Sequence, residues 1–127
     1  PKKTHTKHIL EWLKKADAEV DIYDAVASHA RGYVEGAPVP ATKMQWALYT
    51  CDELTGLIVA VALVKPDKKL ATVTVDSVMK KWSSPSFAAG VDRNQIKECE
   101  ARLGIPVIEF VEIALRAMQG IHDDLGL

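Results

Sequence analysis

The sequence lacks several features that identify particular classes of protein, such as many cysteines or a long apolar segment. It has only 2 cysteines, Cys51 and Cys99, and their separation fits neither a metal-binding nor a redox motif. That usage favours a reducing compartment without structural disulfides. The longest apolar run, Leu57 to Val64, is shorter than a bilayer span requires, and no signal peptide precedes it. We therefore expect a cytoplasmic protein with no membrane partner.

An excess of charge of one sign is also missing. The 127 residues include 16 Lys and Arg and 17 Asp and Glu, for a formal net charge of -1. A balance so close to zero gives no basic footprint for nucleic acid or an anionic membrane. With 48% hydrophobic and 26% charged residues, the composition is that of an ordinary globular protein. The length suits one domain, so we expect a single helical domain over residues 1–127.

Apolar residues recur at helical spacing along most of the chain, which predicts an all-α fold. A short strand around Val73 and Val75, where valines alternate with threonines, is the alternative to one of these helices. The predicted helices run from Thr4 or Thr6 to about Ala16, over Ile22–Ala30, from about Thr42 to before Pro66, over Val75–Trp82, over Arg93–Leu103 and from Pro106 to about Gln119.

Three residues mark the ends of predicted helices. Asp21 and Asp92 are the expected N-caps of the helices that follow them, because an aspartate carboxylate accepts hydrogen bonds from first-turn amides. Gly104 is expected to end the helix that begins after Asp92, because glycine adopts the left-handed conformation of a helix C-terminus.

The longest predicted helix carries a carboxylate pair, Asp52 and Glu53, at its middle. A charge in an apolar helix is costly unless it is paired or bound to a metal. Gly56 lies one turn further along the same face, and glycine costs a helix about 1 kcal/mol relative to alanine, which suggests room for a neighbour of Asp52. The alternative is that Asp52 caps a second helix starting at Glu53. The residues alone favour neither reading.

His5, His29 and Asp52 are the candidate metal ligands. Each falls on the apolar face of a different predicted helix. Imidazole and carboxylate bind borderline divalent metals such as iron, manganese and zinc, and inward-facing side chains build metal sites in helical bundles. Such a metal would lower the pKa of a bound water and hold a phosphate oxygen. The alternative is that the histidines are core residues with satisfied hydrogen bonds.

Lysines form a second candidate group after the longest predicted helix. Lys65 and Lys68, with Lys81 further on, are the candidates for binding a phosphorylated small molecule or nucleotide, because their field attracts anions. The alternative is a solvated basic face, in which Asp67 and Asp76 weaken that field.

Three segments carry a resemblance to a known family: CDELTGLIVAVALVKPDKKL (51–70), MKKW (79–82) and SFAAGVDRNQI (86–96). Together with His29 before a Gly/Pro-rich loop and with His5, they resemble one bacterial subfamily of HD-domain phosphohydrolases. The resemblance covers nearly the entire chain. It implies an all-α, HD-like helical bundle that hydrolyses phosphate esters or nucleotides with a divalent metal ion (Mn, Fe, Zn, Ni or Mg).

The resemblance implies roles for particular residues. Asp52 matches the family's distant metal-binding aspartate, and His29 and His5 match histidines that line the site. The family's first-helix histidine and its His-Asp pair have no match here, and His122-Asp123 repeats the dipeptide only by coincidence, beyond the last amphipathic helix.

This departure leads to two main hypotheses and to a third, in which the chain forms a dimer whose active site is completed by a separate chain carrying the upstream helices. In the first, the chain is the C-terminal portion of an N-terminally truncated HD-type hydrolase domain, and this portion alone is inactive. In the second, the HD site is degenerate and the chain is a non-catalytic helical module. An apolar groove left exposed would favour a homo-oligomer or a partner chain in either case.

Overall fold

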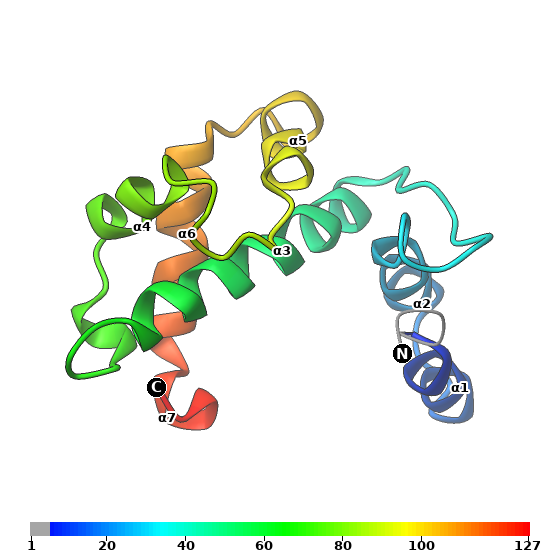
Figure 1. Cartoon of the computed structure of the whole chain (residues 1–127). Helices are drawn as coiled ribbons and strands as arrows, with labels where there is room; N and C mark the ends of the chain where they lie inside the picture. Colours follow the sequence, from blue (N-terminus) through cyan, green and yellow to red (C-terminus); the bar gives the residue numbers. More distant parts are fainter. Residues whose placement is uncertain (1–5) are drawn as a thin grey trace. The chain divides into compact units, whose positions relative to one another are not determined.

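The computed structural model of the chain describes residues 6–127, and all of its regular secondary structure within that range is helical (Figure 1). The predicted all-α class is therefore confirmed. The elements, in chain order, are α1 (Lys7–Lys15), α2 (Val20–His29), α3 (Lys43–Leu63), the short 3-10 helix η2 (Leu70–Thr72), α4 (Val75–Trp82), α5 (Arg93–Leu103), α6 (Val107–Gly120) and α7 (His122–Leu125).

Helices α4 and α5 begin and end where the sequence predicted. The Thr74 hydroxyl accepts a hydrogen bond from the Ser77 amide, and the Ser77 hydroxyl accepts one from the Thr74 amide. This reciprocal cap explains why Val75 starts a helix and not a strand. Asp92 caps α5 as expected, and Gly104 ends it with a φ of 71°.

Other predicted ends differ from the structure. Helix α2 starts at Val20 after Glu19, so Asp21 lies inside the first turn and is not the N-cap. A first-turn carboxylate is still favoured there by the helix dipole, which explains its position. The alternative in which Asp52 caps a new helix is wrong, because α3 is unbroken from Lys43 to Leu63. Both η2 and α7 were missed because one turn is too short to show a periodicity.

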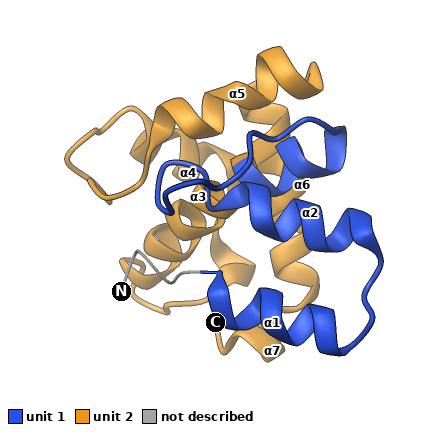
Figure 2. Cartoon of the chain, turned by 90° about the vertical axis from the view of Figure 1, so that its right-hand side faces the viewer, with its two compact units in different colours: residues 1–49 blue, residues 50–127 orange. Residues whose placement is uncertain are grey.

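The chain divides into two compact units, residues 1–49 and 50–127, which Figure 2 colours separately. We call them unit 1 and unit 2. Unit 1 holds α1, α2 and the start of α3, and unit 2 holds the rest of α3 and all later elements.

Unit 2 is built around one core. Helix α6 packs against α4 and α5, while the second half of α3 supplies some of the most deeply buried side chains. The buried residues of this core are Leu54, Leu57, Ile58, Val61, Ala62, Leu70, Val73, Val78, Ile96, Cys99, Val107, Phe110, Val111, Ala114, Leu115 and Met118.

Two polar side chains tie distant segments of unit 2 together. The Gln119 amide donates to the carbonyls of Leu70 and Val73 at 3.0 and 3.1 Å, which holds η2 against α6. The Arg93 guanidinium donates to four carbonyls at the end of α4 and in the loop after it, those of Lys81, Trp82, Ser84 and Phe87. Lys81 and Trp82 belong to the last turn of α4, where carbonyls lack an intrahelical partner, and Ser84 and Phe87 lie in the loop that follows.

Unit 1 buries much less of its apolar surface. Helices α1 and α2 pack against each other, with Leu13 and Ala25 buried. Ile9, Trp12 and Leu13 recur at helical spacing and so form one apolar stripe in the sequence, but only Leu13 is buried, and Trp12 is 62% exposed. Two helices of 9 and 10 residues cover only a narrow strip of each other, so the remainder of the stripe stays exposed.

Helix α3 is the only helix among the described residues that is long and apolar enough to cross a membrane by length and composition. Its most apolar stretch has a mean hydropathy of 1.4, and 39% of that stretch is buried. A core helix of a soluble protein has the same composition, and α3 supplies Leu54, Leu57 and Ile58 to the core of unit 2.

Candidate functional site

Asp52 lies on the exposed side of α3, in unit 2. The buried side of the helix is marked by Leu54 and Ile58, and successive residues are turned by about 100° in an α-helix. Asp52 therefore points away from Leu54 and not along the predicted apolar face. Within residues 6–127 its carboxylate makes no hydrogen bond or ion pair, while its backbone carbonyl accepts one from the Thr55 hydroxyl at 2.8 Å.

Gly56 shares this exposed side. A Cβ atom added at Gly56 would meet no other atom within 4 Å. The close neighbour that the glycine suggested is therefore not found among the described residues. Asp52 and Gly56 together leave an open stretch of helix surface, one turn long.

Glu53 has a different environment from Asp52. Its Oε2 accepts a hydrogen bond from the Asp92 amide at 2.8 Å, which fixes the middle of α3 to the N-cap of α5. Burial, and then the negative charge of Asp52, raises the pKa of the neighbouring Cys51 thiol. The carboxylate pair thus divides into one residue that joins helices and one that faces solvent.

His29 is the last residue of α2, in unit 1, and is half-buried. Its Nδ1 lies 2.5 Å from the carbonyl oxygen of Val26. A carbonyl only accepts, so Nδ1 carries the hydrogen, and in the neutral ring Nε2 keeps the lone pair. A histidine that binds a metal commonly has its other ring nitrogen held in this way.

The structure does not bring the predicted ligands together in one described unit. His29 belongs to unit 1, Asp52 belongs to unit 2, and His5 lies outside the described residues. Among residues 6–127, no group of three or more His, Cys, Asp or Glu side chains is placed to hold a metal ion. Because a catalytic zinc site takes about three protein ligands, the described donor set does not by itself fit a divalent metal.

The predicted substrate-binding lysines have carboxylates or rings beside them. Lys68 is exposed and Lys65 half-buried, in the turn after α3. In that turn Asp67 accepts hydrogen bonds from the Thr72 hydroxyl and the Lys69 amide, which lower its pKa, with a smaller contribution from the charge of Lys65. The Lys81 ammonium lies 4.8 Å from the centroid of the Phe87 ring, a cation–π contact.

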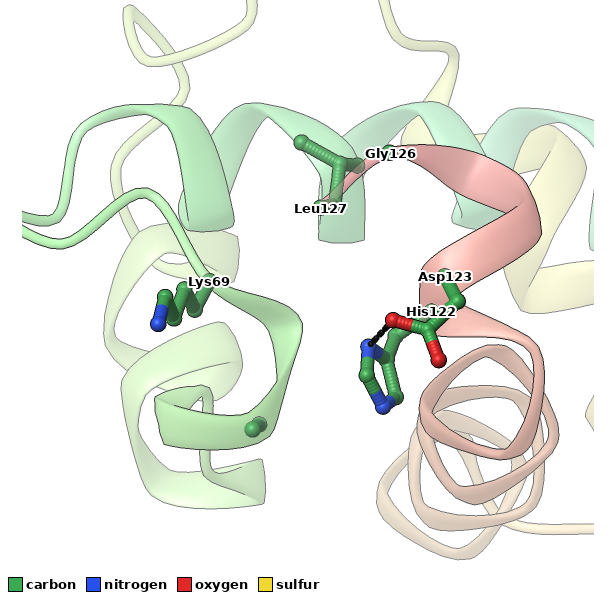
Figure 3. A pocket seen from close by; sticks show the side chains of 6 residues that line it. Lys69, His122, Asp123, Gly126 and Leu127 are labelled. Atoms are coloured by element: carbon green, nitrogen blue, oxygen red, sulfur yellow. Dashed lines mark ion pairs between the residues drawn. The ribbon is translucent and has the colours of Figure 1, made fainter.

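A pocket of about 370 Å³ opens between η2 and α7 in unit 2 (Figure 3). Lys69 and His122 lie on opposite sides of it, and His122 Nδ1 is 3.3 Å from a carboxylate oxygen of Asp123. The side chain of Asp123 is 96% exposed, so this ion pair is a surface feature. The sequence had also placed Lys69 in the lysine cluster that attracts anions, and it gave His122-Asp123 as a coincidental dipeptide.

No protein-family model, curated protein or solved structure matches the chain.

Proposed function

We propose that the chain contributes Asp52 to the divalent-metal site of an HD-type phosphohydrolase that acts on a phosphate ester or a nucleotide. The residues that resemble the family support this, above all the DELTG segment that begins at Asp52. The observation that carries the proposal is an exposed carboxylate, without a hydrogen bond or ion pair in residues 6–127, on a helix anchored in a core. Ligands on such rigid elements hold their geometry best.

The proposal needs more donors than Asp52. The family resemblance proposes His29 and His5 as the imidazole ligands, and His5 lies outside the described residues. We therefore expect no hydrolysis from the described residues alone. Mn, Fe, Zn, Ni and Mg are the candidate ions, because carboxylate and imidazole donors accept all of them.

The test compares two aspartates in a protein that contains the whole chain. Asp52→Asn should weaken Mn²⁺ binding by about tenfold or more, measured by titration calorimetry, and abolish phosphate release from p-nitrophenyl phosphate. Asp76→Asn is the matched control, because Asp76 is exposed and only pairs with Lys80 at 3.0 Å. Equal Mn²⁺ affinity in wild type and Asp52→Asn would remove Asp52 from the site.

The proposed role of the lysines in substrate binding is tested by a separate measurement. Lys65, Lys68 and Lys81 are proposed to attract the phosphorylated substrate, so replacing Lys68 by glutamine should raise KM and leave kcat unchanged. Lys81→Gln should have an additional effect on stability, because it also removes the contact with Phe87. An unchanged KM in both variants would leave these lysines as a solvated surface.

A second candidate function is a non-catalytic helical module that binds a partner. The lack of a three-donor group within residues 6–127 favours it, as do the exposed apolar side chains of unit 1. If the wild-type protein binds none of the five metal ions, the non-catalytic helical module is the better-supported function. Both candidate functions are compatible with the cytoplasmic location expected from the sequence.

A further inference from the structure

Although the net charge of the chain is near zero, it begins with a positively charged stretch that is followed by a negatively charged one. Residues 1–15 contain 5 lysines and 1 glutamate, and residues 16–24 contain 4 acidic residues and no basic one. The first stretch includes α1, and the second includes the connection to α2 and the start of α2. We call the described part of these two helices, residues 7–29, the α1–α2 hairpin.

These charges are exposed and are not paired with each other. Lys7, Lys14 and Lys15 of α1 are exposed. So are the four acidic residues that follow, Asp17, Glu19, Asp21 and Asp24. Within the hairpin no ion pair joins the two sets, since the ion pairs of the described residues lie in unit 2. The Lys14 ammonium lies 5.9 Å from the centroid of the Tyr23 ring of α2, a cation–π contact within the hairpin. The hairpin therefore presents a positive helix and a negative helix whose charges are not paired with each other.

Large apolar side chains are exposed between these charges. Ile9 and Trp12 of α1 are 40% and 62% exposed, and Val20 and Ile22 of α2 are 69% and 43% exposed. Ile9 and Trp12 are three residues apart, so they share one face of α1. Exposed apolar residues rimmed by charge mark interaction surfaces, and tryptophan is enriched among the residues that dominate binding energy.

We propose that a second copy of the chain covers this surface, with α1 of each copy against α2 of the other. The complement to the positive helix is present in the chain itself, whereas packing α1 against a second α1 would oppose lysines with lysines. A two-fold axis forms the α1–α2 contact twice, so one complementary pair of surfaces closes the dimer. The dimer does not depend on the proposed metal site, and it specifies the surface that the helical-module alternative would use.

Charge reversal tests the proposal in the full chain. One variant combines Lys14→Glu with Lys15→Glu, and the other combines Asp21→Lys with Asp24→Lys. Each variant alone opposes like charges at both contacts, so its dimer dissociation constant should rise by about tenfold or more in sedimentation equilibrium. An equimolar mixture should restore the dimer, because both contacts in the mixed pair are again between opposite charges.

Control variants show whether the loss of dimer comes from this surface. Lys97→Glu with wild-type hairpin residues should leave the dissociation constant unchanged, because Lys97 is an exposed lysine of α5 in unit 2. Trp12→Ser should weaken the dimer without a charge change, and circular dichroism should show unchanged helicity in every variant. A monomeric wild type, a dimer that survives both reversals, or variants that do not recombine would overturn the proposal. Mn²⁺ titration of the same samples reports separately on the metal site.

Discussion

Unit 1 and unit 2 are built from similar amphipathic helices but bury them to very different extents. In unit 2 the apolar faces of α3, α4, α5 and α6 meet in one continuous core, and Leu54, Leu57 and Val111 are fully buried. In unit 1 the hairpin buries Leu13 and leaves Trp12 exposed. A helix needs neighbours on its whole apolar face to bury it, and within unit 1 the helices α1 and α2 pack against each other.

Polar side chains in unit 2 join segments that are far apart in the chain. In unit 2, Arg93 and Gln119 reach carbonyls 6 to 49 residues away along the chain. In unit 1, the Ser28 hydroxyl donates to the Ala25 carbonyl and the His29 ring bonds the Val26 carbonyl, each three residues earlier. Long-range bonds hold different helices together, whereas local ones only shape a helix turn. The bonds of Arg93 and Gln119 therefore hold the helices of unit 2 together.

Replacing one large apolar residue in each unit should give the largest difference. Leu57→Ala in the core of unit 2 should lower the free energy of unfolding by about 2 to 5 kcal/mol, because it leaves a cavity. Trp12→Ala in unit 1, measured in dilute solution, should change it by about 0.5 kcal/mol or less. Urea unfolding followed by circular dichroism measures both. A similar loss of unfolding free energy in both variants would contradict the difference in burial between the two units.

Arginine substitutions probe the long-range bonds. Arg93→Lys should cost about 2 to 3 kcal/mol, because a lysine ammonium cannot reach four carbonyls that the planar guanidinium bonds together. Arg31→Lys is the matched control in unit 1, where Arg31 is exposed. Its effect should stay within about 0.5 kcal/mol. Thermal unfolding of both variants would show whether unit 2 depends on the Arg93 bonds.

A substitution in α3, the helix that runs through both units, should raise the stability of the protein. Gly56→Ala should stabilise the protein by about 1 kcal/mol, because alanine favours a helix and its Cβ meets no atom within 4 Å. The melting temperature measures this. If the variant is stabilised but loses Mn²⁺ binding, the open surface beside Asp52 serves a ligand. If the variant is destabilised, another part of the protein packs closely against Gly56.

The smallest expected effect is on the stability of the protein at acid pH, and it comes from Asp67 in the turn after α3. The pKa of Asp67 lies below its ordinary value of 3.8 in the folded state, first because the Thr72 hydroxyl donates to it. Its contribution to stability is therefore present above the unfolded pKa and is lost as pH falls through the folded pKa. Thr72→Val should lower stability only above that pH range, where Asp67 is ionised, so its stability should fall less with acid and converge with that of wild type at lower pH. A difference that is independent of pH would show that the threonine acts by packing.

Prediction from the sequence succeeded where the signal was local. The spacing of apolar residues predicted α4, and the Asp92 cap and Gly104 set the ends of α5 as predicted, through contacts with residues close in the chain. Asp21 failed as a cap because the chain already turns at Asp17, which has a φ of 51°, so that α2 starts earlier. Local turn geometry of this kind leaves no clear periodic signal.

The candidate site was less predictable. The sequence identified Asp52 and His29 as unusual, but it assigned both to an apolar interior. In the structure Asp52 faces solvent, and its neighbour Glu53 makes the long-range bond to the Asp92 amide. Nothing local distinguishes the two carboxylates, because the difference arises from α5, which packs beside only one of them.

The sequence by itself determined that this protein is helical and where most helices begin and end, since spacing and capping act over a few residues. It also determined the opposite charges of α1 and α2. Only the tertiary structure decided which faces are buried, which carbonyls Arg93 joins and which unit each candidate ligand belongs to. Burial and long-range bonds depend on helices that are distant in the chain, and no local pattern encodes their packing.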